Sequence, residues 1–137
     1  MTIDLLGVAE YATFAEPGLS ITNYRKLWTV DSFPGNLDLT FVIVLETTAE
    51  EAEQNDEATL SCFSPDGKNW IPDLKIKLRL DTSEDPAADM GAIYFLARAE
   101  GIPVDKPGIY KIEFRTGKEV ATHSIRIVER KKEDGNS

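Results

Sequence analysis

The chain has 137 residues, of which 42% are hydrophobic and 28% are charged, so it can form one domain with a packed core. The formal net charge of −9 argues against binding to nucleic acid or to membranes, because nucleic acid and anionic lipid both require a basic surface. No apolar run approaches the roughly 20 residues of a membrane-spanning helix, and no basic residues precede the first apolar stretch, which argues against a secretory signal. A single cysteine excludes an internal disulfide and suits a reducing compartment, so we expect a cytoplasmic protein.

The first third of the chain predicts three strands. Residues 3–14 and 19–28 are rich in apolar, β-branched and aromatic side chains, and the turn sequence Glu16-Pro17-Gly18 separates them. The apolar spacing of the first segment would also fit a short helix. Residues 37–45 are apolar at every odd position, and their even positions change from polar residues to valine. This pattern is typical of a central strand that is covered on both faces.

The middle of the chain alternates between acidic and basic segments. Residues 47–57 are strongly acidic and predict a solvated loop or one helical turn, whereas residues 58–63 predict a further strand. Residues 74–80 alternate strictly between apolar and basic side chains, which indicates a strand with one buried and one solvated face. Lysines along an edge strand discourage pairing between sheet edges, so we expect an edge position for this strand.

The last third predicts a strand over residues 92–97 and a hairpin within residues 104–129. With Thr116-Gly117 as a two-residue turn, Ile112 would lie opposite Ala121 and Tyr110 opposite His123. The apolar residues of both strands then fall on one face of the hairpin.

Turn signals recur about every eight to twelve residues, with short strands between them. This spacing predicts an all-β fold, an Ig-like Greek-key β-sandwich of about seven to eight mostly antiparallel strands. We expect a single domain over residues 1–129, followed by a polar flexible tail over residues 130–137.

One motif adds a resemblance. The sequence Pro107-Gly108-Ile109-Tyr110 resembles the tyrosine corner of Greek-key sandwiches, in which the tyrosine hydroxyl bonds to the backbone a few residues upstream. The wider layout resembles a family of small uncharacterised bacterial proteins of Ig-like sandwich shape. The other matching pieces are the apolar segment ending at Ala9-Glu10, the turn Gly18-Leu19-Ser20-Ile21, Phe33-Pro34, and Ser64-Pro65-Asp66-Gly67. The resemblance implies the fold and a bacterial origin, and it carries over no activity and no functional residue.

Catalytic and metal-binding motifs are absent from the sequence. It contains no nucleophile elbow, zinc-protease motif, phosphate loop or dinucleotide fingerprint, so we expect no enzyme, no metal and no other cofactor. We expect His123, the single histidine, at the rim of a sheet facing Tyr110, with a catalytic role as the alternative. Cys62 is expected to be a buried, inert thiol. The carboxylates of residues 81–89 could bind calcium but do not fit an EF-hand loop, so we expect a solvated turn there.

Six residues are candidates for binding a ligand or partner. They are three aromatic residues and the basic face of residues 74–80: Tyr24, Trp28, Trp70, Lys75, Lys77 and Arg79. Tyr24 and Trp28 would share one face of residues 19–28, where exposed rings could stack on a sugar or a peptide, with a core position for Trp28 as the alternative.

No motif specifies a function. The sequence favours a non-enzymatic binding module whose partner is a protein or a second copy of the chain. Three alternatives stay open: a homo-oligomeric structural subunit, a cryptic hydrolase using His123, and an acidic inhibitor that mimics nucleic acid through residues 47–57.

Overall fold

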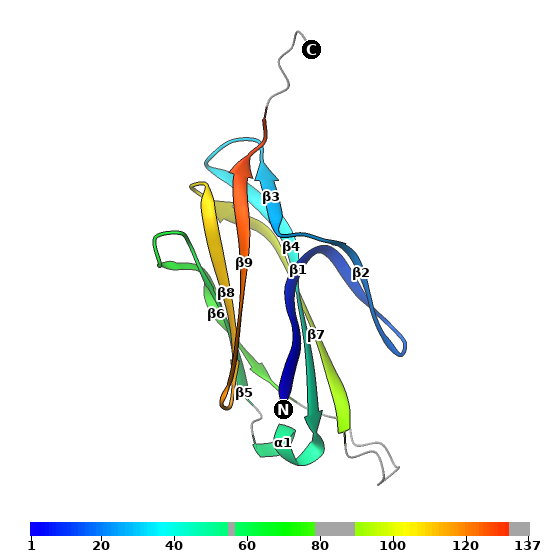
Figure 1. Cartoon of the computed structure of the whole chain (residues 1–137). Coiled ribbons are helices and arrows are strands. Elements are labelled where there is room, and N and C mark those ends of the chain that lie inside the picture. Colours follow the sequence, from blue (N-terminus) through cyan, green and yellow to red (C-terminus); the bar gives the residue numbers. More distant parts are fainter. Residues whose placement is uncertain (55–56, 79–89, 132–137) are drawn as a thin grey trace.

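The computed structural model describes residues 1–54, 57–78 and 90–131 (Figure 1). These residues form nine strands and one short helix, in place of the seven to eight strands expected from the sequence. The elements are β1 (Thr2–Ala15), β2 (Gly18–Tyr24), β3 (Leu27–Val30), β4 (Gly35–Thr48), α1 (Ala49–Gln54), β5 (Glu57–Phe63), β6 (Asn69–Lys77), β7 (Met90–Val104), β8 (Gly108–Thr116) and β9 (Glu119–Glu129).

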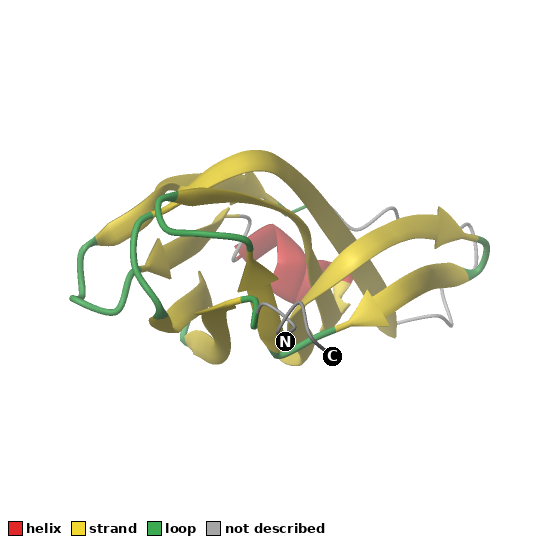
Figure 2. Ribbon diagram, turned by 90° about the horizontal axis from the view of Figure 1, so that it is seen from above, coloured by secondary structure: helices red, strands yellow, loops and turns green. Residues whose placement is uncertain are grey.

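The strands form two sheets, which confirms the all-β fold class. Sheet A has four strands in the order β2-β1-β4-β7, and sheet B has five in the order β3-β9-β8-β5-β6. Strands β3 and β9 run parallel, and every other pair in the two sheets is antiparallel. Figure 2, viewed along the strands, shows α1 at the far end of the space between the sheets.

The core lies between the two sheets and follows from the alternation of side chains along each strand. On β4 the odd positions face the core, with Phe41 and Ile43 exposed by 3% or less. On β8 the alternate residues Ile112 and Phe114 meet them from sheet B, and both are fully buried. Burial of each such side chain away from water contributes roughly 1.5–3 kcal/mol to the stability of the folded state. The central position predicted for residues 37–45 is confirmed, because β4 lies between β1 and β7.

Strand β1 pairs with two neighbouring strands, each along a different part of its length. The helical alternative for residues 3–14 is therefore wrong. Its residues 2–9 pair with β4, with a bulge between Ile3 and Leu5, and its residues 9–15 pair with β2. The hairpin of β1 and β2 projects to the right of the body in Figure 1. A second, smaller apolar cluster joins this hairpin to β4 and β7, and its members are Leu5, Ala9, Ala12, Leu19, Val42 and Leu96.

The segment 19–28 is two strands, not the single strand that its composition predicts. Strand β2 ends at Tyr24, directly after Asn23, whose φ of 56° is in the left-handed region. The chain then crosses to sheet B, where Lys26 accepts a 2.8 Å backbone hydrogen bond from Arg126 and β3 begins. Tyr24 and Trp28 therefore belong to different sheets.

The hairpin of β8 and β9 has a different turn from the predicted one. The turn residues are Gly117 and Lys118, so Ile112 lies opposite His123 and Tyr110 opposite Ile125. The predicted partners were wrong by two residues. Because side chains alternate with a period of two, this slip leaves the same residues facing the core.

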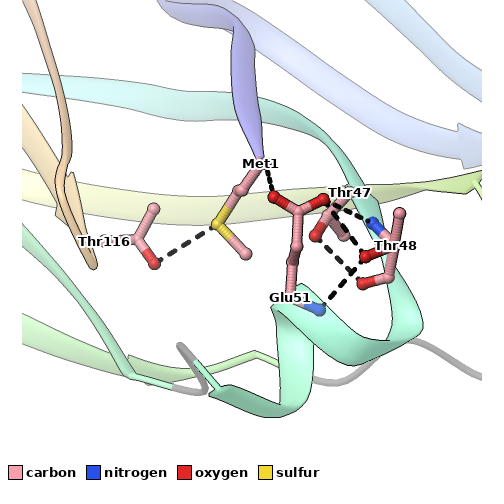
Figure 3. A network of polar contacts seen from close by, with 5 residues as sticks. All are labelled: Met1, Thr47, Thr48, Glu51 and Thr116. Atoms are coloured by element: carbon pink, nitrogen blue, oxygen red, sulfur yellow. Dashed lines mark hydrogen bonds and ion pairs between the residues drawn. The ribbon is translucent and has the colours of Figure 1, made fainter.

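The acidic segment forms a helix of six residues, α1, within the predicted range. Thr48 and Glu51 cap its start reciprocally, as Figure 3 shows: the Glu51 amide donates to Thr48 Oγ1 over 3.1 Å, and the Thr48 amide donates to Glu51 Oε1 over 3.3 Å. The Met1 amine also contacts the Glu51 carboxylate. These partners lower the pKa of Glu51, the amine most strongly and Thr48 next.

Candidate binding pocket

A pocket of about 410 Å³ lies where the β5–β6 turn meets the segment that joins β7 to β8. Strands β5 and β8 are neighbours in sheet B, which brings these two connections together. The side chains that define the pocket are Asp66 and Lys106 on the connections and Trp70 and Tyr110 on the strands.

The β5–β6 turn, Ser64-Pro65-Asp66-Gly67, is a turn as predicted. The Gly67 amide donates a 2.9 Å hydrogen bond to the Ser64 carbonyl, and Gly67 has a φ of +82°, which a residue without a side chain adopts readily. The Asp66 carboxylate accepts hydrogen bonds from the Ser64 hydroxyl and, over 3.4 Å, from the Lys68 amide. These bonds fix the orientation of the Asp66 side chain.

An ion pair links the two connections across the pocket. Lys106 Nζ lies 2.8 Å from Asp66 Oδ2. The ammonium group of Lys106, followed by the hydroxyl of Ser64, holds the pKa of Asp66 well below its usual range. Asp66 is therefore an anion throughout the neutral range, and it serves as a hydrogen-bond acceptor.

Two aromatic side chains form the wall of the pocket. The Trp70 indole donates a 2.8 Å hydrogen bond to the Pro103 carbonyl, and its ring meets the Tyr110 ring edge-on, with centroids 4.6 Å apart. The Tyr110 hydroxyl donates a 2.6 Å hydrogen bond to the Lys106 carbonyl. The predicted bond from Tyr110 to the backbone upstream is thus confirmed. Burial raises the pKa of Tyr110, so its hydroxyl remains protonated and keeps donating.

The charges around the pocket balance. Asp66 and Asp105 face Lys68 and Lys106 among its lining residues, so the site favours neither a strongly anionic nor a strongly cationic ligand. The partly buried ring of Trp70 offers an apolar surface beside these polar groups. This combination suits a neutral group with both apolar and hydrogen-bonding atoms, such as an extended peptide.

Of the five predicted binding residues that the structure describes, Trp70 alone lines this pocket. Trp28 is only 3% exposed, because it packs in the core between the sheets. Its indole donates a 3.1 Å hydrogen bond to the Arg25 carbonyl, and the Arg25 guanidinium lies 4.8 Å from its ring centroid. The proposed surface pair of Tyr24 and Trp28 is therefore wrong, and the core alternative for Trp28 is correct.

Tyr24 has His123 as its aromatic neighbour. Tyr24 is 45% exposed, and its ring meets the His123 ring edge-on with centroids 5.9 Å apart. His123 is half-buried, and its Nε2 atom has no hydrogen-bond partner among the described residues. Burial lowers the pKa of His123, and the charge of Lys26 lowers it further. The predicted contact with Tyr110 is wrong, since Tyr110 pairs with Ile125 and packs against Trp70.

The basic face lies on β6, which is an edge strand of sheet B as predicted. Lys75 and Lys77 are exposed there, beside a shallow hollow of about 420 Å³ that also contacts Glu57 and Thr59. Arg79 and the candidate calcium loop of residues 81–89 lie outside the described residues. Within the ranges described, no group of three or more His, Cys, Asp or Glu side chains could hold a metal ion.

Cys62 is buried, as predicted. It is 3% exposed between Leu60 and Ile112 in the core of sheet B. Burial, followed by the charge of Asp73, raises the pKa of the thiol to about 12. The reactive thiolate is therefore scarce at neutral pH.

The comparison with known families matches most of the chain. Residues 12–128 match a family described as Family of unknown function (DUF6941). No curated protein matches the chain. In the part of the chain that the structure describes, no helix has both the length and the apolar character needed to cross a bilayer.

Proposed function

The chain belongs to this family of unknown function (DUF6941), and we propose that it is a non-enzymatic binding module. An extended segment of a partner protein binds in the pocket beside Trp70. The observation that carries this proposal is the pocket of about 410 Å³, with an aromatic wall and charges that balance. Ligand sites are commonly concave and preformed, with a few fixed polar groups.

The protonation states of the pocket support binding over catalysis. A general base works best when its pKa lies near the working pH. The pKa of Asp66 is instead held well below its usual range by Lys106 and Ser64. Asp66 is thus a poor proton acceptor and a good hydrogen-bond acceptor for a peptide amide.

We also place the sandwich in the Ig-like Greek-key class, in the cytoplasm of a bacterium. Three features support the class: the tyrosine corner at Tyr110, the sheet containing β1-β4-β7, and the sheet containing β9-β8-β5-β6. These orders correspond to strands A-B-E and G-F-C-C′ of immunoglobulin domains. A single buried cysteine is consistent with a reducing cytoplasm. NMR contacts between strands that contradict these orders would remove the fold assignment.

Selection from a displayed peptide library tests the binding proposal. A Trp28→Phe background leaves Trp70 as the single tryptophan, so its fluorescence reports on ligand in the pocket. We expect selected peptides to change this fluorescence. In titrations with dye-labelled peptides, which need no tryptophan in the protein, we expect Trp70→Ala to weaken binding by about 30-fold or more, as at other buried aromatic anchors. Tyr11→Ala is the matched control, because Tyr11 is an exposed aromatic residue that does not line the pocket. Peptides that bind Trp70→Ala as tightly as the parent would contradict the proposal.

A further inference from the structure

Strand β2 is an edge of sheet A that carries no charge. Of the described strands, only β1 pairs with it, so its other edge is unpaired (Figure 1). The sequence of β2, GLSITNY, contains no charged residue and no proline. The edge strand β6 of sheet B, in contrast, carries Pro72, Asp73, Lys75 and Lys77. Charges and proline protect an edge against pairing, and β2 lacks both.

Exposed hydrophobic side chains gather on the same part of the chain. Nine large hydrophobic residues of the described chain are exposed, and five of them fall between residues 11 and 27. These five are Tyr11, Phe14, Ile21, Tyr24 and Leu27. An unpaired strand with exposed apolar neighbours is suited to adding a strand from another chain.

The charges that flank β2 make it complementary to itself. Glu16 precedes the strand and Lys26 follows it, and both are exposed. If two copies pair antiparallel about Ile21, the midpoint of Gly18–Tyr24, the start of each β2 strand lies beside the end of the other. Glu16 of each copy then lies at the same end of the paired strands as Lys26 of the other, because Glu16 precedes β2 and Lys26 follows it. A two-fold axis makes both contacts at once.

We propose that two copies of the chain pair through their β2 strands about a two-fold axis and join their A sheets into one continuous sheet. Backbone hydrogen bonds between the β2 strands supply the contact, and Ile21 meets its own copy at the centre. Attraction between Glu16 and Lys26 at the two ends of the paired strands favours the antiparallel orientation. The acidic chain, with a formal net charge of −9, meets its copy along an uncharged strand.

Light scattering after gel filtration, over a range of protein concentrations, tests this dimer. We expect the wild type to approach twice the mass of one chain as concentration rises. Ile21→Lys and Ile21→Glu each place like charges directly opposite one another at the axis, so each variant alone is expected to be a monomer. Mixing the two is expected to restore a dimer, because opposite charges then meet. Leu74→Lys on β6 is the matched control, because Leu74 and Ile21 are similarly exposed, by 41% and 37%. This control variant is expected to leave the dimer intact.

The flanking charges give a second test that leaves the strand itself unchanged. Glu16→Lys and Lys26→Glu are each expected to raise the dissociation constant by about tenfold, through two like-charge contacts per dimer. The double variant Glu16→Lys/Lys26→Glu is expected to recover the wild-type value. Circular dichroism checks that each variant is folded.

Three results would overturn the proposal. The first is a wild type that stays monomeric up to about 1 mM, a concentration at which even a weak dimer is populated. The second is a dimer that Ile21→Lys leaves intact although the variant is folded. The third is a dimer that Leu74→Lys disrupts and Ile21→Lys does not, which would place the interface on β6.

Discussion

The hydroxyl of Tyr110 donates a 2.6 Å hydrogen bond to the carbonyl oxygen of Lys106, four residues earlier in the chain. The same tyrosine ring packs against Trp70, and the Lys106 side chain pairs with Asp66. One local bond therefore fixes the β7–β8 connection at the position where it forms a side of the pocket.

Tyr110→Phe removes this hydrogen bond and keeps the ring. We expect the free energy of unfolding to fall by about 1 kcal/mol, because the Lys106 carbonyl loses its donor while the apolar packing remains. Urea denaturation measures the change. Tyr11→Phe is the control, since the Tyr11 side chain is 54% exposed, and it should lie within about 0.5 kcal/mol of wild type. Equal losses in both variants would mean that the corner bond adds nothing to stability.

His123 should make stability depend on pH. Its pKa in the folded protein is lowered from the ordinary 6.5 by burial and by Lys26, so the folded state favours the neutral ring. The unfolded chain binds a proton more readily near and below pH 6.5, and stability should therefore fall as pH decreases through this range.

The measurement compares urea midpoints of wild type and His123→Gln between pH 7.5 and pH 5. The wild type should lose stability more steeply than the variant over this interval, since carboxylates titrate equally in both. Parallel curves would show that His123 does not contribute.

Gly7 has no side chain and so leaves room for the ring of Tyr24, which packs against His123. A methyl group built on Gly7 would lie 2.2 Å from Cε2 of Tyr24, which is closer than two carbon atoms can approach. Gly7→Ala should therefore displace the Tyr24 ring, expose His123 to water, and raise the pKa of His123 toward its ordinary value. Histidine NMR signals followed through a pH titration report this shift. In a Tyr24→Ala background, adding Gly7→Ala should change nothing further, and an undiminished shift in that background would refute the coupling.

The thiol of Cys62 should be unreactive in the folded protein. Its pKa is raised to about 12 by burial and by Asp73, and the residue is 3% exposed, so both the thiolate and the access for a reagent are lacking. At pH 8 a chromogenic disulfide reagent should label Cys62 slowly in buffer and rapidly in denaturing urea. Rapid stoichiometric labelling in buffer, with the far-UV spectrum unchanged, would show that the strand opens locally.

The sequence predicted the elements whose side chains alternate between core and solvent. The faces of β8 and β9 were predicted correctly although the turn was misplaced by one position, because a two-residue slip preserves the face of every side chain. The division between β2 and β3 was not predictable in this way. Apolar and aromatic residues recur from Leu19 to Trp28 among polar ones, so the segment resembles one long strand. In the structure, the left-handed backbone at Asn23 and the crossing to sheet B separate the two strands.

The pocket could be predicted only in pieces. Trp70 was a candidate, and the Ser64–Gly67 turn and the hydroxyl bond of Tyr110 were expected from local motifs. The ion pair between Asp66 and Lys106 joins residues 40 positions apart, and the Trp70–Pro103 bond spans 33. Both contacts depend on β5 lying beside β8 in sheet B. No local pattern in the sequence specifies that neighbourhood.

The parallel pairing of β3 with β9 has a consequence for biosynthesis. Leu27 is matched with Arg126, so the ribosome must add a further 99 residues before β3 finds its neighbour. At about 5–20 residues per second, this delay lasts on the order of 5–20 s. Throughout that interval the indole of Trp28 lacks the neighbouring strand β9, and a chaperone can bind it in the nascent chain. A stop codon that removes β9 would make this temporary exposure permanent.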